Sequence, residues 1–163
     1  MADTRKPFTA FDRKLVKGWI EWVAGHSEPP ADMSSYDSIM DHLSGLLSQD
    51  FVKEYGGEEL FAIGVAWGDA LQKKHDGWEW VSMANRGGST VALDLRGAEG
   101  ITDPEALVTP GHIFARRAGM PEEMDPRMME TMLLQELTAP REAADAGPDG
   151  GAGAGTGAGA TEA

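Results

Sequence analysis

One aspartate stands out among the side chains that could take part in chemistry. Asp69 interrupts a strongly apolar segment, residues 60–71, whose spacing is that of a helix. A carboxylate inside a buried helix needs a partner, and Arg86, Arg116 or Arg117 could supply a bidentate one. On a helical wheel Asp69 lies opposite the main apolar stripe. Solvent exposure, a structural ion pair and a functional role therefore all remain open.

The sequence holds no recognisable catalytic or metal-binding motif. The four histidines are scattered, no Gly-x-Ser-x-Gly elbow is present, and no glycine-rich loop has a phosphate-binding pattern. Asp37, Asp41 and His42 come closest to a metal cluster, but carboxylates at this spacing are common on solvated helix faces. Without cysteine there are no disulfides, thiolate ligands or cysteine nucleophiles. We predict no catalytic residue, metal or cofactor, and a non-enzymatic protein is favoured over an enzyme.

Tryptophan and methionine are the other residues that could form a binding surface. Trp67 and Trp80 could line a pocket, although large aromatic side chains at helix and strand spacing more often belong to the core. Five of the nine methionines fall within residues 120–132, and flexible thioethers suit adaptable partner grooves. The last helix is expected to carry two apolar stripes, one of Met124, Met128 and Met132 and the other of Met129, Leu133 and Leu137. Docking of this helix on the core explains the methionine stripe as well. Two stripes leave room for both interpretations, with one docked inward and one offered to a partner.

The strongly negative net charge of the chain bears on the class of partner that it could bind. The 163 residues carry a formal net charge of −13, which disfavours nucleic acid because phosphates must be neutralised by cations. The charge is uneven, at +3 over residues 1–20, −9 over 21–85 and −4 over 86–138. The basic start could steer an acidic partner or, as we favour, lie against the acidic middle. A polar N-terminus and a longest apolar run of only residues 60–68 predict a cytoplasmic protein without membrane contact.

The elements that must position these residues follow from periodicity and capping. Helices are expected over 9–25, from Ser34 or Ser35 onward, over 58–74, over 110–118 and over 122–137. Residues 78–84 and 90–95 alternate as strands of a hairpin, and 106–109 is the candidate third strand. The helix over 58–74 is apolar on nearly all sides, which predicts a central position. Gly64 and Gly68 within it predict the close approach of another backbone.

This pattern predicts an α+β fold. A central buried helix and flanking helices pack on a small antiparallel sheet within a single domain, residues 1–138. Residues 139–163 are rich in glycine and alanine and cannot bury enough apolar surface to offset their ordering entropy. They are expected to form a disordered tail.

Several positions resemble a bacterial family of small proteins classed only as a domain of unknown function. The matching residues are Gly64, Trp67-Gly68-Asp69-Ala70-Leu71, Trp80-Val81, Thr90-Val-Ala-Leu and the element from Pro110 to Arg117. The resemblance covers about residues 58–118. In this chain the segment between the two hairpin strands is shorter than is usual in that family. The resemblance implies an α+β domain and brings no established activity.

We therefore expect a non-catalytic domain that binds another protein, as a regulatory, adaptor or immunity-type protein does, or that associates with itself, through residues 121–138. The alternative is a small-ligand-binding protein or enzyme with a pocket between the central helix and the hairpin. Trp67 or Trp80 would line that pocket, and Asp69 with Arg116 or Arg117 would provide its polar groups.

Overall fold

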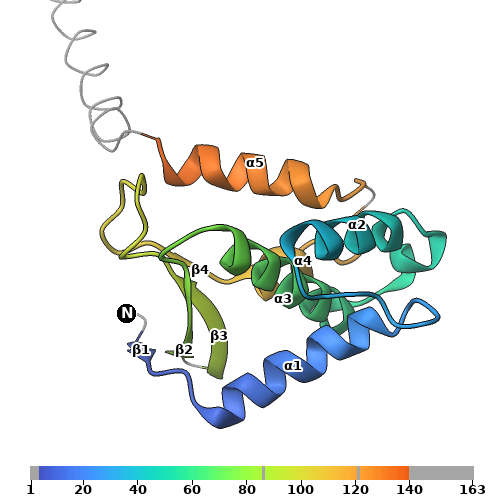
Figure 1. The fold of residues 1–163 in the computed structure, drawn as a ribbon, viewed down its shortest axis with the longest axis horizontal. Coiled ribbons are helices and arrows are strands. Elements are labelled where there is room, and N and C mark those ends of the chain that lie inside the picture. The colour runs from blue at the N-terminus through green and yellow to red at the C-terminus, as the bar shows by residue number, and fades with distance from the viewer. Residues whose placement is uncertain (1–3, 86, 121, 140–163) are drawn as a thin grey trace, which may run out of the picture.

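The computed structural model describes residues 4–85, 87–120 and 122–139. Within them the chain forms an α+β fold, which confirms the predicted fold class (Figure 1). The order of elements is β1 (Thr4–Lys6), α1 (Ala10–Ala24), α2 (Tyr36–Leu47), a 3₁₀ turn η1 (Asp50–Glu54), α3 (Gly57–Lys74), β2 (Glu79–Asn85), β3 (Gly88–Asp94), β4 (Leu107–Val108), α4 (Pro110–Ala115) and α5 (Pro126–Leu137).

The first two helices begin where their capping residues predict. Thr9 precedes α1 and forms a reciprocal capping box with Asp12, whose carboxylate accepts the Thr9 backbone N–H at 2.9 Å. Ser35 plays the same part before α2 with Ser38. Both helices then turn an apolar stripe toward α3. Local sequence is sufficient to place these two starts.

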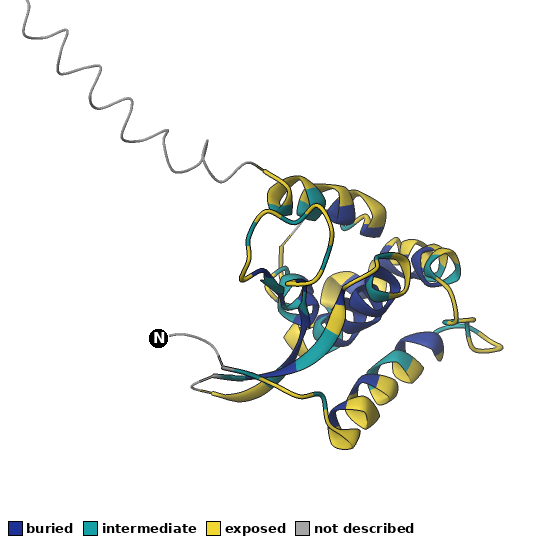
Figure 2. Ribbon diagram, turned by 60° about the vertical axis from the view of Figure 1, so that its left-hand side comes forward, coloured by how far each residue is buried: buried dark blue, intermediate teal, exposed yellow. Residues whose placement is uncertain are grey.

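Helix α3 lies at the centre of the molecule, as its composition predicts. Leu60 and every residue from 62 to 71 are buried, and α1, α2 and α4 all pack against the helix. Buried residues gather in this middle region, whereas the outer faces of α1 and α5 are exposed (Figure 2).

The predicted close approach at the α3 glycines is confirmed. The N-terminal end of α4 crosses α3 at this point. A Cβ on Gly64 would overlap the Pro110 carbonyl oxygen and lie 2.8 Å from the Gly111 Cα. A Cβ on Gly68 would lie 2.5 Å from the Pro110 Cγ and 3.0 Å from the Trp80 ring. The two glycines therefore allow α4 to reach the α3 backbone, in return for a lower helix propensity.

The sheet is antiparallel, with the strand order β1-β2-β3-β4. The predicted hairpin is confirmed, with β2 and β3 in register from Glu79 opposite Asp94 to Asn85 opposite Gly88. The candidate third strand is confirmed as β4, which pairs with β3. Strand β1 was not predicted, because three residues are too few to show a strand period. It adds to the outer edge of β2, with Thr4 opposite Ala84.

Two predicted helices are shorter in the structure. Helix α4 ends at Ala115 rather than at 118. Helix α5 begins at Pro126 rather than at 122, because the Asp125 carboxylate accepts the backbone N–H groups of Arg127 and Met128 and proline occupies the first helical position. Met124 consequently precedes the helix, so the predicted stripe of three methionines is wrong. Only Met128 and Met132 share a helical face.

The predicted tail, residues 139–163, lies outside the described residues apart from Ala139. The division into one domain over 1–138 and a tail stays a prediction. Among the described residues, no helix combines the length and the apolar character that crossing a membrane requires.

Candidate functional site

A cavity between α3, α4 and α5 brings together four of the eight residues proposed from the sequence. It measures about 290 Å³. Its lining is mainly apolar with charged groups at the side, and consists of Trp67, Ile113, Arg116, Arg117, Met129, Met132, Leu133 and Glu136. Trp67 is fully buried, and its indole N–H donates to the Pro126 carbonyl oxygen at 2.9 Å. This bond ties the start of α5 to the central helix and so fixes the cavity wall.

Two arginines without a carboxylate partner flank this cavity. Arg116 caps the end of α4 and is exposed, and Arg117 follows it and is half-buried. Neither side chain forms an ion pair or a hydrogen bond with any residue in the described ranges. Arg117 also lines a second hollow of about 40 Å³ together with Met120 and Met124. The walls of this second hollow also include the charged side chains of Lys53, Glu122 and Glu123. Arg117 thus borders both hollows, whereas Arg116 borders the larger one alone.

Methionines extend the apolar surface beside these hollows. Met120, Met128 and Met132 are 53%, 56% and 55% exposed, values that are high for such large apolar side chains. Met129, which lines the larger cavity together with Met132, is buried. We name the combination of Arg116, Arg117, Met120, Met124, Met128, Met132 and the larger cavity the α4–α5 surface.

Asp69 forms a structural ion pair, one of the three alternatives, but with Lys73 and not with Arg116 or Arg117. The Asp69 carboxylate accepts from the Lys73 ammonium at 2.7 Å and from the Trp80 indole N–H at 3.3 Å. Arg86 lies outside the described residues, and Arg116 and Arg117 line the cavity at α5 instead. The alternative in which Asp69 is exposed is wrong, since the residue is 8% exposed. A helix places residue i+4 on the same side, so Lys73 is the sterically nearest cation.

Trp80 and Trp67 belong to different parts of the molecule. The Trp80 ring stacks on Phe8 with centroids 6.2 Å apart and packs against Gly68. Trp67 instead contacts Phe114 at 5.2 Å. The proposed site residues thus divide into a group at α5 and the pair formed by Asp69 and Trp80. Of these residues, the described cavity at α5 includes Trp67, Arg116 and Arg117 but neither Asp69 nor Trp80.

Substituting Asp69 tests whether its contacts are structural. We expect Asp69→Ala to lower the free energy of unfolding by about 1–2 kcal/mol, because the half-buried Trp80 indole N–H loses its acceptor. Asp69→Asn keeps an acceptor oxygen and should cost less than half as much. Chemical denaturation measures both values. A cost below about 0.5 kcal/mol for Asp69→Ala would show that these contacts contribute nothing to stability.

A buried polar cluster around Glu130 was missed in the sequence. The Glu130 carboxylate accepts from the Tyr36 hydroxyl at 2.5 Å, the Lys74 ammonium at 3.2 Å and the His75 Nε2 at 2.8 Å. Glu130 is 3% exposed, although it lies on the last helix of the described chain. The available sign of burial in the sequence was its position next to Met129 and one turn before Leu133, beside one of the two predicted apolar stripes. The cluster joins α2, the end of α3 and α5.

These contacts shift the pKa values of the groups in the cluster. Burial raises the pKa of Glu130, but the hydrogen bonds from Tyr36, His75 and Lys74 outweigh it, so that its pKa is lowered overall. Burial and the neighbouring Glu130 carboxylate raise the pKa of Tyr36. For Lys74, the attraction of Glu130 exceeds the opposing effect of burial and raises its pKa. The carboxylate thus stays charged and acts as an electrostatic anchor for α5.

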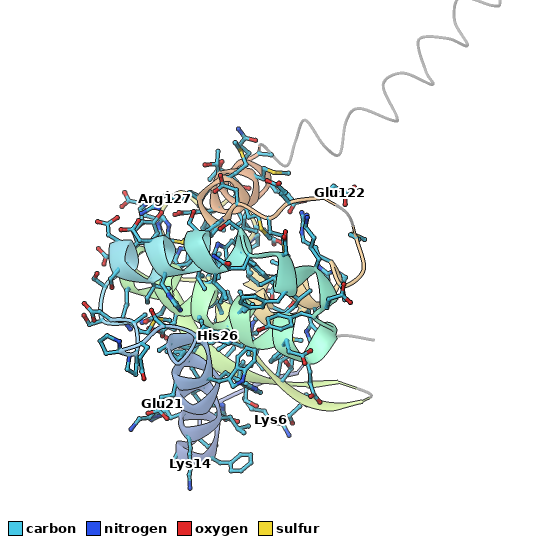
Figure 3. All side chains as sticks on the ribbon, turned by 90° about the vertical axis from the view of Figure 1, so that its right-hand side faces the viewer. Lys6, Lys14, Glu21, His26, Glu122 and Arg127 are labelled. Carbon is cyan, nitrogen blue, oxygen red and sulfur yellow. The ribbon has the colours of Figure 1, made fainter. Side chains whose placement is uncertain are left out.

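The described residues contain no group of three or more histidine, cysteine, aspartate or glutamate side chains placed to hold a metal ion. Asp37 and Asp41, which the sequence suggested as the nearest approach to a metal site, lie beside an arginine instead. Arg127 lies 3.4 Å from Asp37 and 3.1 Å from Asp41, and Figure 3 shows it at the junction of α5 with α2. His42 Nε2 lies 2.8 Å from the Val23 carbonyl oxygen.

Comparison with solved structures supports the fold. A protein from Bacteroides thetaiotaomicron VPI-5482, with a crystal structure at 1.50 Å resolution, is similar to this chain with a TM-score of 0.65 and 12% sequence identity. The match covers 82% of this chain and 48% of that one, so this chain spans about half the length of its structural neighbour. At this identity the likeness concerns the fold alone. None of the curated proteins compared with this chain matches it.

Part of this chain also matches the model of a protein family. The matched segment runs from α2 to the start of α4 and includes the whole of α3 and the hairpin. It therefore contains Trp67, Asp69 and Trp80, whereas Arg116, Arg117 and α5 lie beyond it. The resemblance to a family of unknown function is confirmed: residues 40–112 match the model of the family described as "Domain of unknown function (DUF3806)".

Proposed function

We propose that this domain acts in the cytoplasm as a non-catalytic protein-binding module, and that its α4–α5 surface receives an acidic segment with a large apolar side chain. The observation that carries the proposal is the pair of arginines beside the cavity. Arg116 and Arg117 form no ion pair with the described residues, while the acids of this chain far outnumber its cations. Arg5, Arg96 and Arg127 each lie beside a carboxylate, for example Arg96 beside Asp94 at 2.6 Å.

The chemistry of the surface suits a carboxylate-bearing peptide. A guanidinium offers a planar set of donors that matches a carboxylate through two hydrogen bonds. The cavity of about 290 Å³ has room for an apolar side chain, and Ile113, Met132 and Leu133 form its apolar walls. Exposed Met128 and Met132 can adjust their rotamers to a partner at little cost. Apolar contact supplies affinity and the arginines supply selectivity.

Selection from a displayed library of random peptides tests this proposal on the full chain. We expect enriched sequences to place aspartate or glutamate next to a large apolar residue. A synthetic peptide of this kind should bind the double variant R116E/R117E at least about tenfold more weakly, since charge-assisted hydrogen bonds contribute about 1.5–3 kcal/mol each. The matched control is K6E/K14E, which makes the same change in net charge. Lys6 and Lys14 lie far from α5 (Figure 3).

The outcomes separate the proposal from its alternatives. Binding that is equal in the parent and in R116E/R117E would contradict it, as would a selection that enriches no sequence. Self-association through the same surface is a distinct result: size-exclusion chromatography would show a dimer that R116E/R117E converts to a monomer, and the partner would then be a second copy. Circular dichroism of each variant confirms that the fold is retained.

A further inference from the structure

A second hollow, on the other side of α3 from α5, has a different chemistry. It measures about 430 Å³, within the usual range for ligand pockets of about 300–1,000 Å³. Helix α1 contributes Trp19 and Trp22, and the first turns of α3 contribute Glu58, Glu59, Phe61 and Ala62. The hollow thus combines three aromatic rings with two carboxylates. Neither lysine nor arginine lines it.

Two of the rings, Trp19 and Phe61, form a corner and do not stack on each other. Trp19 and Phe61 lie 5.1 Å apart between centroids and are inclined at 66°. In such an edge-to-face pair, the edge of one ring points at the face of the other. Both faces of the first ring therefore stay free of that contact. Trp22 is 41% exposed, which is high for an indole side chain. Its ring also contacts His26 edge-to-face at 4.5 Å and Tyr55 at 6.0 Å, and these contacts hold it at the rim of the hollow.

The carboxylates have few competing partners. Glu59 accepts the Gly56 backbone N–H at 3.0 Å through Oε1 and so caps α3. Glu58 is exposed and forms no ion pair within the described part of the chain. The partial positive charge at the start of α3 amounts to about half an elementary charge. Two carboxylates exceed it, so the hollow keeps a net negative potential.

We propose that the hollow between α1 and α3 binds an organic cation that carries a methylated ammonium group. The negative faces of indole and phenyl rings attract such a cation, which is weakly hydrated and fills an apolar corner, and the carboxylates balance its charge. An inorganic cation is a poorer fit, because calcium takes six to eight oxygen ligands. An anion would be repelled by Glu58 and Glu59. A free metabolite and a methylated lysine of a protein share this chemistry.

Titration with choline tests the site in the full chain, with tryptophan fluorescence and indole N–H chemical shifts as readouts. Tetramethylammonium serves as a second probe. The control ligand is the neutral isostere of choline in which carbon replaces nitrogen, because it has the same shape and no charge. We expect saturable binding of both cations and much weaker binding of the isostere. Equal binding of choline and its isostere would overturn the proposal, as would the absence of saturable shifts with either cation.

Variants assign the binding to this hollow. Trp22→Ala should weaken choline binding between about twofold and thirtyfold, the range for one cation–π contact. Glu58→Gln should weaken it as well, and it removes only an exposed charge, so it tests the site even if Trp22→Ala fails to fold. The matched control is Phe11→Ala on the same helix, which removes a ring that is 68% exposed and outside the hollow. If Phe11→Ala weakened binding as much as Trp22→Ala, the assignment would be wrong.

A peptide with trimethyllysine and the same peptide with unmodified lysine distinguish the sources of the cation. Tighter binding of the methylated peptide than of choline would identify a protein ligand. Binding of choline alone would identify a small molecule. The α4–α5 surface does not contribute to this hollow, so R116E/R117E should bind choline as the parent does. Failure of one proposal therefore leaves the other standing.

Discussion

Gly64→Ala is expected to lower the free energy of unfolding by about 2 kcal/mol. A Cβ at this position would overlap the Pro110 carbonyl oxygen and press on the Gly111 Cα, and both are backbone atoms that cannot rotate away. Overpacking of this kind costs about 1–3 kcal/mol or more. Alanine recovers about 1 kcal/mol of helix propensity, which leaves a net loss because a rigid contact falls at the upper end of that range. Thermal and chemical denaturation measure the change.

The chain offers a matched control for this prediction. Gly45 in α2 and Gly18 in α1 are exposed helical glycines at which a Cβ would meet nothing within 4 Å. Gly45→Ala and Gly18→Ala should therefore stabilise the protein by up to about 1 kcal/mol each. Opposite signs at Gly64 and Gly45 would show that the close crossing of α4 over α3 determines the outcome. A stabilising Gly64→Ala would show that the two helices do not meet as described.

Glu130→Ala is expected to lower the free energy of unfolding by about 3 kcal/mol. The substitution removes the common acceptor of Tyr36, Lys74 and His75 and leaves their donors facing an apolar gap. Breaking a fully buried ion pair costs about 3–5 kcal/mol. The lower end applies here, because the Lys74 side chain is 45% exposed and can regain water. Glu136→Ala, which removes an exposed carboxylate from the same helix, should cost far less.

The same residue makes stability depend on pH in a defined direction. The pKa of Glu130 is lowered in the folded protein, so its contribution is fully present above the pKa of the unfolded chain. The contribution is lost as the pH falls through the lower pKa of the folded state. Glu130→Gln cannot titrate. The difference in unfolding free energy between the parent and Glu130→Gln should therefore shrink below the ordinary glutamate pKa of 4.5. A difference that stays constant from neutral to acidic pH would contradict the assignment.

Local signals in the sequence were sufficient for most of the fold. Thr9 and Ser35 place two helix starts through their own side chains, and the turn between β2 and β3 needs only nearby residues. Gly64 predicted a close contact without naming the partner, since any backbone would satisfy it. The α4 backbone proved to be that partner. Such features depend on residues a few positions apart, which periodicity and capping describe well.

The site was harder to predict, because it depends on which side chains meet across the fold. Asp69 could be expected to need a cation, but Lys73 on its own helix provides one, and the arginines lie elsewhere. Glu130 bonds to three groups between 55 and 94 positions away in the chain. The composition of the chain does not indicate that these side chains form a hydrogen-bonded cluster. The hollow between α1 and α3 likewise requires two helices to be placed side by side before its rings and carboxylates converge.

The pairing of β1 with β2 has a consequence for the order of events during synthesis. Thr4 faces Ala84 and Lys6 faces Ser82, so the first strand has to wait for a partner about 80 residues further along the chain. At a translation rate of about 5–20 residues per second, this interval lasts roughly 4–16 s. Arg5 in that strand also lacks Asp94 and Glu105, its later ion-pair partners, throughout the interval. Among the described elements, the strand that leaves the ribosome first is thus one of the last to gain its native contacts.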